Sequence, residues 1–218
     1  MARIEKDFLG EKELPDTAYY GVQTLRGKEN FHITGIPMAT EPYFVKAFGY
    51  VKKAAALANR DLGVLDAKVA NAIAAACDRL IAGELRDQFV TDFIQGGAGT
   101  STNMNANEVL ANVALESLGH KKGEYQFVNP NDHVNFGQST NDVYPTAFRL
   151  ALILRLESYM EALTKLQQSF AAKGKEFSKV LKMGRTHLQD AVPMSLGQEF
   201  NGWATTIPAS RFGPRRRE

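Results

Sequence analysis

Residues 129–145 read Asn-Pro-Asn-Asp-His-Val-Asn-Phe-Gly-Gln-Ser-Thr-Asn-Asp-Val-Tyr-Pro, and a long helical pattern follows them. Ser139 stands three residues before Asp142, a variant of the capping box, and Pro145 fits only a first helical turn. We therefore expect Ser139, Thr140 and Asn141 at a helix N-terminus, where free N–H groups and the helix dipole attract anions. An ordinary N-cap behind a polar loop would have the same sequence.

A second polar stretch, residues 95–108, reads Gln-Gly-Gly-Ala-Gly-Thr-Ser-Thr-Asn-Met-Asn-Ala-Asn-Glu. It is not a phosphate loop, because no lysine follows the glycines and the third glycine of the dinucleotide fingerprint is absent. A backbone rich in glycine can approach a small ligand closely, with Thr100 and Ser101 as donors. The alternative is a glycine turn in front of a capped helix.

The third polar stretch, residues 183–193, places His187 beside Thr186 and between two helical patterns. A histidine in such a position can equally be a structural residue. We expect no metal site, because the other histidines show no ligand spacing with His187 and Cys77 is the single thiol of the chain. Cys77 itself is in phase with apolar neighbours and is expected in the core.

The rest of the chain contains mainly helical patterns. Residues 1–40 are expected to form an irregular arm with short extended pieces, because glycine and proline interrupt them too often for a helix. Helices are expected at 42–62 and 66–82, as an antiparallel hairpin without evident chemistry, and through Val109 and Leu115 to near Gly119. The longest helix should run from about 142 to 173, with Gly174 as its stop, and a last one from about 195 to a break at 207–208.

Composition excludes some classes of function. The chain has 218 residues, of which 44% are hydrophobic and 23% charged, as is ordinary for a globular protein. The net charge of +2 arises from the arginines of the last eight residues, so no basic face and no nucleic-acid partner are expected. No apolar run reaches membrane length, and the first residues are charged, so a cytoplasmic protein without membrane association is expected.

Together, the three polar stretches resemble one family. Residues 97–105, 138–142 and 184–187 are similar to the first conserved regions of the aspartase/fumarase superfamily, in the same order and spacing. The resemblance extends from about Arg3 to Trp203. Within the superfamily the chain most resembles the aspartate ammonia-lyases, through Tyr-Tyr-Gly-Val-Gln-Thr-Leu-Arg at residues 19–26 and through the threonine at position 140. Fumarate hydratases typically carry Trp-Gly-Ala-Gln-Thr-Gln-Arg and a second serine at these places.

The resemblance implies a mostly α fold. Residues 1–140 would form an N-terminal helical domain with its arm, residues 141–207 the beginning of a central long-helix bundle, and residues 208–218 an unstructured basic tail. The family forms homotetramers whose active sites take residues from three subunits. Its reaction is the reversible elimination of ammonia from L-aspartate to fumarate, without a cofactor.

The resemblance also implies roles for individual residues. An aci-carboxylate intermediate carries extra negative charge on the β-carboxylate and needs fixed donors. Hydroxyls would hold that carboxylate, amide and imidazole groups would hold or polarise the amino group, and His187 would be the catalytic residue of this part of the chain. The substrate-binding residues implied are Thr100, Ser101, Ser139, Thr140, Asn141, Thr186 and His187.

The sequence departs from the family pattern near its C-terminus. The family's general base is a serine in a Gly-Ser-Ser-x-Met-Pro-x-Lys-x-Asn signature, which residues 1–218 do not contain. A frameshift or a shortened gene model would produce such an ending. We expect the 218-residue chain to be a truncated and inactive fragment of the enzyme. The alternatives are a fumarate hydratase of the same superfamily and a non-catalytic fragment.

Overall fold

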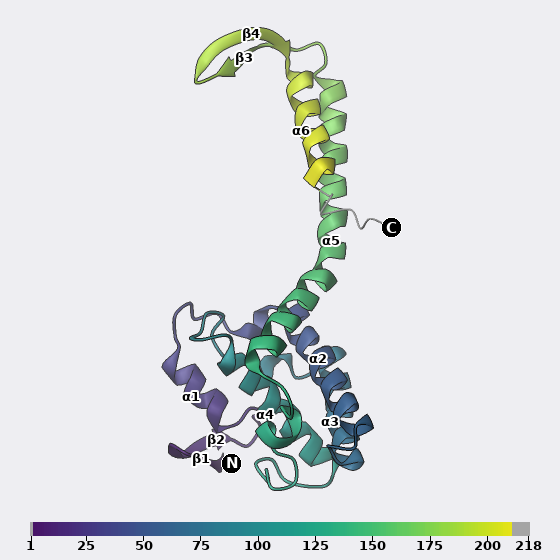
Figure 1. Ribbon diagram of the computed structural model, residues 1–218. Coiled ribbons are helices and arrows are strands. Elements are labelled where there is room, and N and C mark those ends of the chain that lie inside the picture. The colour runs from purple at the N-terminus through teal and green to yellow at the C-terminus, as the bar shows by residue number, and fades with distance from the viewer. Residues whose placement is uncertain (1, 211–218) are drawn as a thin grey trace. The chain divides into compact units, whose positions relative to one another are not determined.

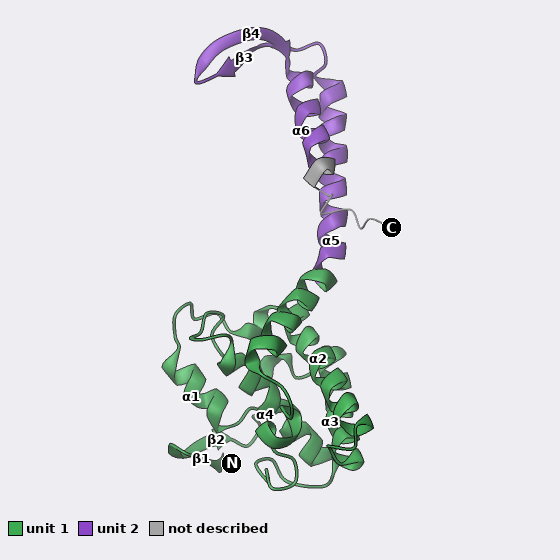
Figure 2. Cartoon of the chain, in the orientation of Figure 1, with its two compact units in different colours: residues 1–154 green, residues 155–218 purple. Residues whose placement is uncertain are grey.

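The computed structural model describes residues 2–210, with side chains described through Ile207. The chain forms two compact units, residues 1–154 and 155–218 (Figure 2). Helices dominate the described residues, so the expected mostly α fold is confirmed. The domain boundary expected at residue 140 stays a prediction.

The first unit contains a small β-hairpin, the helices that pack against one another, and the start of α5 (Figure 1). Its elements are β1 (Ala2–Asp7), β2 (Gly10–Pro15), α1 (Val22–Asn30), η1 (Met38–Thr40), α2 (Pro42–Asp61), α3 (Ala67–Ile81), η2 (Arg86–Gln88), α4 (Thr100–Ser117), η3 (Pro130–Val134) and the beginning of α5 (Thr140–Glu176). The second unit holds the rest of α5, then β3 (Leu181–Thr186), β4 (Gln189–Ser195) and α6 (Leu196–Ser210).

Helix α4 is the centre of the first unit. Every residue from 102 to 115 is buried, although the helix carries asparagines and a glutamate among its apolar residues. These polar side chains are bonded to the loops around the helix. Asn105 accepts from Val90 N and donates to Gln88 O, while Asn112 accepts from Gly123 N and donates to Tyr19 O. Because buried polar groups need partners, α4 holds its neighbouring loops in place as well as packing against helices.

Helices α2 and α3 form the expected helix pair, and α3 packs against α4 (Figure 1). Asp66 caps α3 as expected, accepting from Lys68 N at 2.9 Å and Val69 N at 3.1 Å. Cys77 is completely buried, so its expected place in the core is confirmed. The two helices approach closely at Gly49, where a Cβ would lie 2.8 Å from Ile81 Cγ1.

The arm is more regular than expected. Residues 2–15 form the antiparallel hairpin β1–β2, with Ala2 opposite Pro15 and Asp7 opposite Gly10, and residues 22–30 form helix α1. The prediction that glycines exclude a helix here was wrong. Gly27 lies within α1 and faces α4, where its Cβ would meet Ser101 Cβ at 3.1 Å, so this glycine permits close packing.

The ends of α5 and α6 also differ from expectation. Helix α5 continues past Gly174 to Glu176, because Gly174 faces α6 and serves close helix packing there: a Cβ on Gly197 would lie 2.5 Å from Gly174 O. Pro145 lies in the second turn of α5, beyond the first turn predicted for it. Helix α6 runs through the expected break at Pro208 to Ser210, and residues 211–218 of the predicted tail lie outside the described residues. None of the described helices has the length and apolarity needed to cross a membrane.

One carboxylate, Asp92, orders the loop that joins α1 to α2. Its Oδ2 accepts from the backbone N–H groups of Ile33, Thr34 and Gly35, and its Oδ1 accepts from Thr34 Oγ1 and Ile94 N. Burial alone would raise the pKa of Asp92, but these donors outweigh it and hold the pKa at about 2.

We predict that Asp92→Asn weakens the fold at neutral pH and flattens its acid unfolding. A depressed carboxyl pKa contributes stability above the unfolded value of 3.8, and that contribution is lost as pH falls toward about 2. Urea midpoints measured by circular dichroism between pH 7 and 2 test this. Asp61→Asn is the control, because Asp61 is exposed and forms a surface ion pair with its neighbour Arg60. An unchanged slope between pH 4 and 2 in Asp92→Asn would contradict the prediction.

Candidate functional site

The predicted site residues of the first unit lie at the starts of α4 and α5. Gly99 precedes α4 with φ +88°, and a Cβ there would collide with the Tyr144 ring, so the glycine lets residues 95–99 lie directly against α5. Thr100 and Ser101 form the first turn of α4, and Thr140 and Asn141 the first turn of α5. Thr140 and Ser101 are half-buried, and the others are exposed.

Ser139 caps α5, as the sequence predicted. Its Oγ accepts from Asn141 N at 3.2 Å and its carbonyl accepts from Val143 N at 3.0 Å. The two helix starts are linked directly, because Asn103 Nδ2 on α4 donates to Thr140 Oγ1 at 3.3 Å. Two helix N-termini therefore lie in the same region of the first unit, with the positive ends of their dipoles.

Two cavities border these helix starts. Three of the predicted residues line one or the other of them. Thr100 and Ser101 line a cavity of about 580 Å³ together with residues of α1 that include Gln23 and Arg26. Asn141 lines another cavity of about 410 Å³, whose walls are Tyr144, Pro145 and the 93–99 loop. Ser139 and Thr140 line neither of these two cavities.

Arg26 brings a charge to the larger cavity, but a carboxylate already holds it. Its Nε donates to Asp7 Oδ2 at 2.8 Å, and its NH2 group donates to Asp7 Oδ1 and Gly10 O, each at 2.9 Å. The bond from Arg26 lowers the pKa of Asp7. Arg26 thus fixes the β1–β2 hairpin against α1, which shapes the wall of the cavity.

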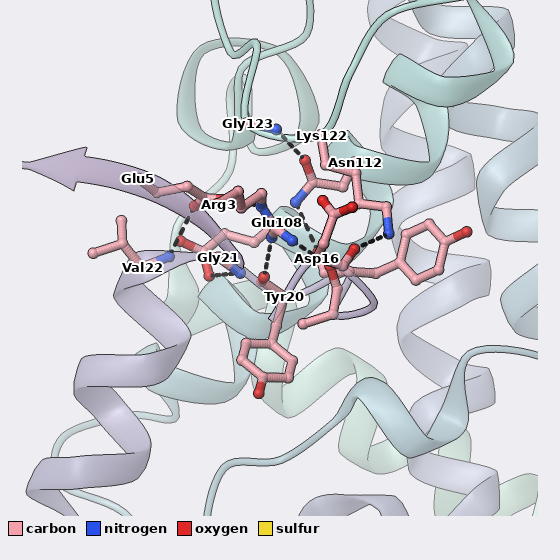
Figure 3. A network of polar contacts seen from close by, with 12 residues as sticks. Arg3, Glu5, Asp16, Tyr20, Gly21, Val22, Glu108, Asn112, Lys122 and Gly123 are labelled. Carbon is pink, nitrogen blue, oxygen red and sulfur yellow. Dashed lines mark hydrogen bonds and ion pairs between the residues drawn. The ribbon is translucent and has the colours of Figure 1, made fainter. Parts of the chain in front are cut away.

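Two buried carboxylates hold α1 against α4 (Figure 3). The first N–H groups of a helix have no partner within it. Here Glu108 of α4 accepts from Gly21 N, Gln23 N and Thr24 N at 2.9–3.0 Å and from Thr24 Oγ1 at 2.6 Å, while Glu5 of β1 accepts from Val22 N at 3.0 Å. A Cβ on Gly21 would lie 2.6 Å from Glu5 Oε2, so only glycine fits there. This cap explains why a helix forms in a segment whose own sequence lacks a cap.

The charges of this cap are balanced in part by Arg3. Burial and, to a smaller extent, the nearby Glu5 raise the pKa of Glu108, the bonds from Thr24 and Gln23 lower it, and the net value is about 7. Arg3 Nε donates to Glu5 Oε1 at 2.8 Å and the guanidinium also donates to Ala18 O and Tyr20 O (Figure 3). The three backbone N–H groups bonded to Glu108 can only donate, and they favour its carboxylate form.

Lys52 reaches the entry of α5 and was not predicted to have any role. This α2 lysine is completely buried, and its Nζ donates to Asn135 Oδ1 and Gln138 Oε1, each at 2.9 Å. The sequence did contain a signal for it. Lys52 continues the apolar row of Val45, Phe48 and Ala56, and a lysine in such a row must find buried acceptors.

Thr186 and His187 belong to the second unit, where they lie at the tip of the β3–β4 hairpin. They lie between two helices, α5 and α6, as the sequence predicted, but the hairpin that carries them was not predicted. Thr186 pairs with Gln189 across the hairpin, leaving His187 and Leu188 as a two-residue turn, and both have positive φ (49° and 63°). Such turns usually contain asparagine or glycine, so the histidine is held in an uncommon backbone conformation and projects from an exposed loop.

Within residues 2–207, no group of three His, Cys, Asp or Glu side chains is placed to hold a metal ion. The starts of α4 and α5 in the first unit offer a ligand hydroxyl and amide side chains and backbone N–H groups. Donors of this kind suit a small anion.

The chain is similar to known lyases along almost its whole length. A family model described as Lyase matches residues 10–211. The aspartate ammonia-lyase of Helicobacter pylori strain J99 is 58% identical over 205 residues, and that of Escherichia coli K12 is 56% identical over 206 residues. These matches cover 94% of this chain and 44% and 43% of the two relatives, so the chain spans less than half of their length.

Solved structures show the same similarity. A fumarate lyase:delta crystallin protein from Brucella melitensis in native form is 55% identical, with a TM-score of 0.88, over 96% of this chain and 49% of that chain. A class II fumarase from Schistosoma mansoni is 38% identical, with a TM-score of 0.83, over 96% of this chain and 44% of that chain.

We predict that Glu108→Gln destabilises the first unit by about 3 kcal/mol, because an amide nitrogen would then face buried N–H donors. Urea unfolding gives the free energy, and hydrogen exchange of residues 22–30 shows whether α1 loosens first. Glu29→Gln is the control, since Glu29 lies on α1 in an exposed pair with Lys12, and such pairs contribute little. Equal effects of the two substitutions would rule out the proposed role of the buried cap.

Proposed function

Because the chain belongs to the lyase family whose model matches residues 10–211, we propose that it forms the N-terminal part of an aspartate ammonia-lyase. The reaction is the reversible elimination of ammonia from L-aspartate to give fumarate. The curated relatives that carry this name, at 56–60% identity, support the assignment. Since the chain spans about 44% of the length of such a relative, the activity proposed is that of the longer protein.

The observation that carries the proposal is the hydrogen bond between Asn103 of α4 and Thr140 of α5, which brings two helix N-termini together. In the elimination, a base removes a proton from C3, and the electron pair moves onto the β-carboxylate. The aci-carboxylate then collapses, the C2–N bond breaks and ammonia leaves. Fixed hydroxyls and helix N-termini stabilise the extra charge, so Thr100, Ser139 and Thr140 are proposed to hold the β-carboxylate.

Other roles in this proposal come from the family resemblance. Asn141 and His187 would hold or polarise the amino group, and Ser101 and Thr186 would contact the substrate beside them. The exposed position of His187 on its hairpin supports a function in ligand contact more than one in the core. The base would be the serine of the family signature that residues 1–218 lack. Homotetrameric assembly and a cytoplasmic location are further parts of the proposal.

A fumarate hydratase is the second candidate, and the structural similarity to a class II fumarase favours it. Both reactions eliminate a group from C2 of a four-carbon dicarboxylate, so the same carboxylate-binding residues would serve either. Supplying L-aspartate and L-malate separately to the full-length protein, and following fumarate absorbance, distinguishes them. Fumarate from L-malate alone would replace the ammonia-lyase assignment by the hydratase.

We predict that Thr140→Ala and His187→Ala, each in the full-length protein, lower kcat/KM for L-aspartate by about 10²–10³ while assembly is kept. The reason is the loss of one fixed donor to a developing charge. Cys77→Ala is the control, because Cys77 is a buried core residue to which the resemblance gives no role in the site. Near-normal fumarate production by both variants would refute the assigned site.

We predict that residues 1–218 expressed alone form no fumarate from L-aspartate and associate with themselves. General-base catalysis contributes about 10²–10⁴ in rate, and the proposed base lies outside this sequence. Large apolar side chains are exposed along α5, among them Leu152, Ile153 and Tyr159, and uncovered apolar surface promotes association. Light scattering and an absorbance assay test both parts. A monomeric chain would contradict the predicted association. Fumarate formation would contradict the predicted lack of activity.

A further inference from the structure

Lys52 is a buried amine, and its acceptors among the described residues are two side-chain amides. It lies on the buried face of α2 with Phe48 and Ala56, and its Nζ donates to the amide oxygens of Asn135 and Gln138. The titratable groups near it are the Cys77 thiol on α3 and the Asp142 carboxyl on α5, and burial lowers its pKa to about 7. A buried lysine without a bonded carboxylate is unfavourable, so its donors must be needed where they are.

The acceptors of Lys52 lie in the segment that leads into α5. Gln138 directly precedes the cap residue Ser139 and donates to Val134 O at 2.9 Å, and Asn135 donates to Gln138 O at 3.0 Å. Asn135 Oδ1 also accepts from the amide nitrogens of Asn103 and Asn107 on α4, at 3.1 and 3.2 Å. Lys52 therefore joins α2, α4 and the entry of α5 through one oxygen atom.

The same network contacts a residue of the proposed site. Asn103 Nδ2 lies within hydrogen-bond distance of both Asn135 Oδ1 and Thr140 Oγ1. A displacement of Asn135 would thus change the position of the Asn103 amide, and with it the contact that links the starts of α4 and α5. Donors that stabilise a developing anion lose their effect when they are misplaced by about 1 Å.

We propose that Lys52 is a positioning residue whose buried Nζ donors fix the start of α5, residues 139–141, relative to α4. This inference rests on the proposed function for its catalytic consequence, but its structural part can be tested without any ligand. Lys52 would act through Asn135 and Gln138, and it would contact no substrate.

The hydrogen bonds of Lys52 explain why an apolar residue would not hold the 135–138 segment in place. Methionine would fill the same space as the lysine stem, but it has no N–H group. In the described part of the chain the Oδ1 atoms of Asn103 and Asn107 are already buried without a hydrogen-bond partner. Removing the donors of Lys52 would leave Gln138 Oε1 without a donor and weaken the hold on Asn135, so the 135–138 segment would rearrange toward solvent.

Local order and global stability should respond differently to this substitution. The folded pKa of Lys52, about 7, is below its ordinary value of 10.5, so the folded state binds this proton more weakly than the unfolded state does. The resulting penalty on stability grows as pH falls from 10.5 to about 7, and methionine would abolish it. Lys52→Met should therefore loosen the start of α5 without a matching loss of overall stability.

Hydrogen exchange of the full chain, followed by mass spectrometry at pH 7, tests the proposal. In Lys52→Met we expect at least tenfold lower protection in peptides covering 135–146, with protection in α3 (67–81) within twofold of the parent. Lys53→Met is the matched control, since Lys53 is the next residue and its partner Asp78 is exposed. Unchanged exchange in 135–146, or an equal loss in both regions, would overturn the proposal.

A second variant covers the case in which Lys52→Met does not fold. Gln138→Met removes one of the two acceptors from a half-buried position and should loosen the same peptides by about threefold or more. If its exchange is unchanged, the proposal fails.

A kinetic measurement separates this inference from the proposed function. In an active full-length protein, Lys52→Met should lower kcat/KM for L-aspartate by about tenfold or more, with Lys53→Met unchanged. If the full-length parent forms no fumarate from L-aspartate, the proposed function is overturned. A loss of protection at 135–146 in Lys52→Met would still support the positioning role. Normal kinetics in Lys52→Met would remove the catalytic consequence.

Discussion

Helix α4 carries polar side chains into the centre of the first unit, and each of them requires a partner there. Glu108 binds the start of α1, Asn105 binds the loop before residue 91, Asn112 binds the arm and the 123 turn, and Asn103 binds Asn135 and Thr140. A buried polar group without a partner is expensive in free energy. The loops around α4 are therefore held by hydrogen bonds from the core, and the proposed site is assembled from these loops.

This arrangement suits a site that must bind and stabilise an anion. Loops are mobile when they are held only by their own residues, whereas catalytic donors need fixed positions. In the first unit, Thr100 and Thr140 each start a helix, and Asn103 connects the two starts. Helix starts present backbone N–H groups in a fixed direction, and their dipoles favour negative charge. The core of the unit thus supports the proposed chemistry directly.

Glycine has two functions in this chain, and the sequence pattern alone suggests only the first of them. Gly63 and Gly83 follow helices with positive φ, as helix-ending glycines do. Gly21, Gly27 and Gly174 instead lie where a Cβ would come too close to a neighbouring side chain. Local sequence cannot distinguish a glycine that ends a helix from one that admits a neighbour, which is why α1 was missed and α5 was expected to end early.

The sequence by itself determined the features whose causes are local. The apolar period of α2 and α3, the capping by Asp66 and by Ser139, and the burial of Cys77 all follow from residues a few positions apart. The three polar stretches also carried the family resemblance, which the comparisons bear out. Tertiary structure alone decided the features whose causes are distant in the chain. Helix α1 depends on carboxylates at positions 5 and 108, and the entry of α5 depends on a lysine at position 52. The local sequence can mark one partner of such a bond, as the lysine in the apolar row of α2 does, but not the other, because only folding brings the donor and the acceptor together.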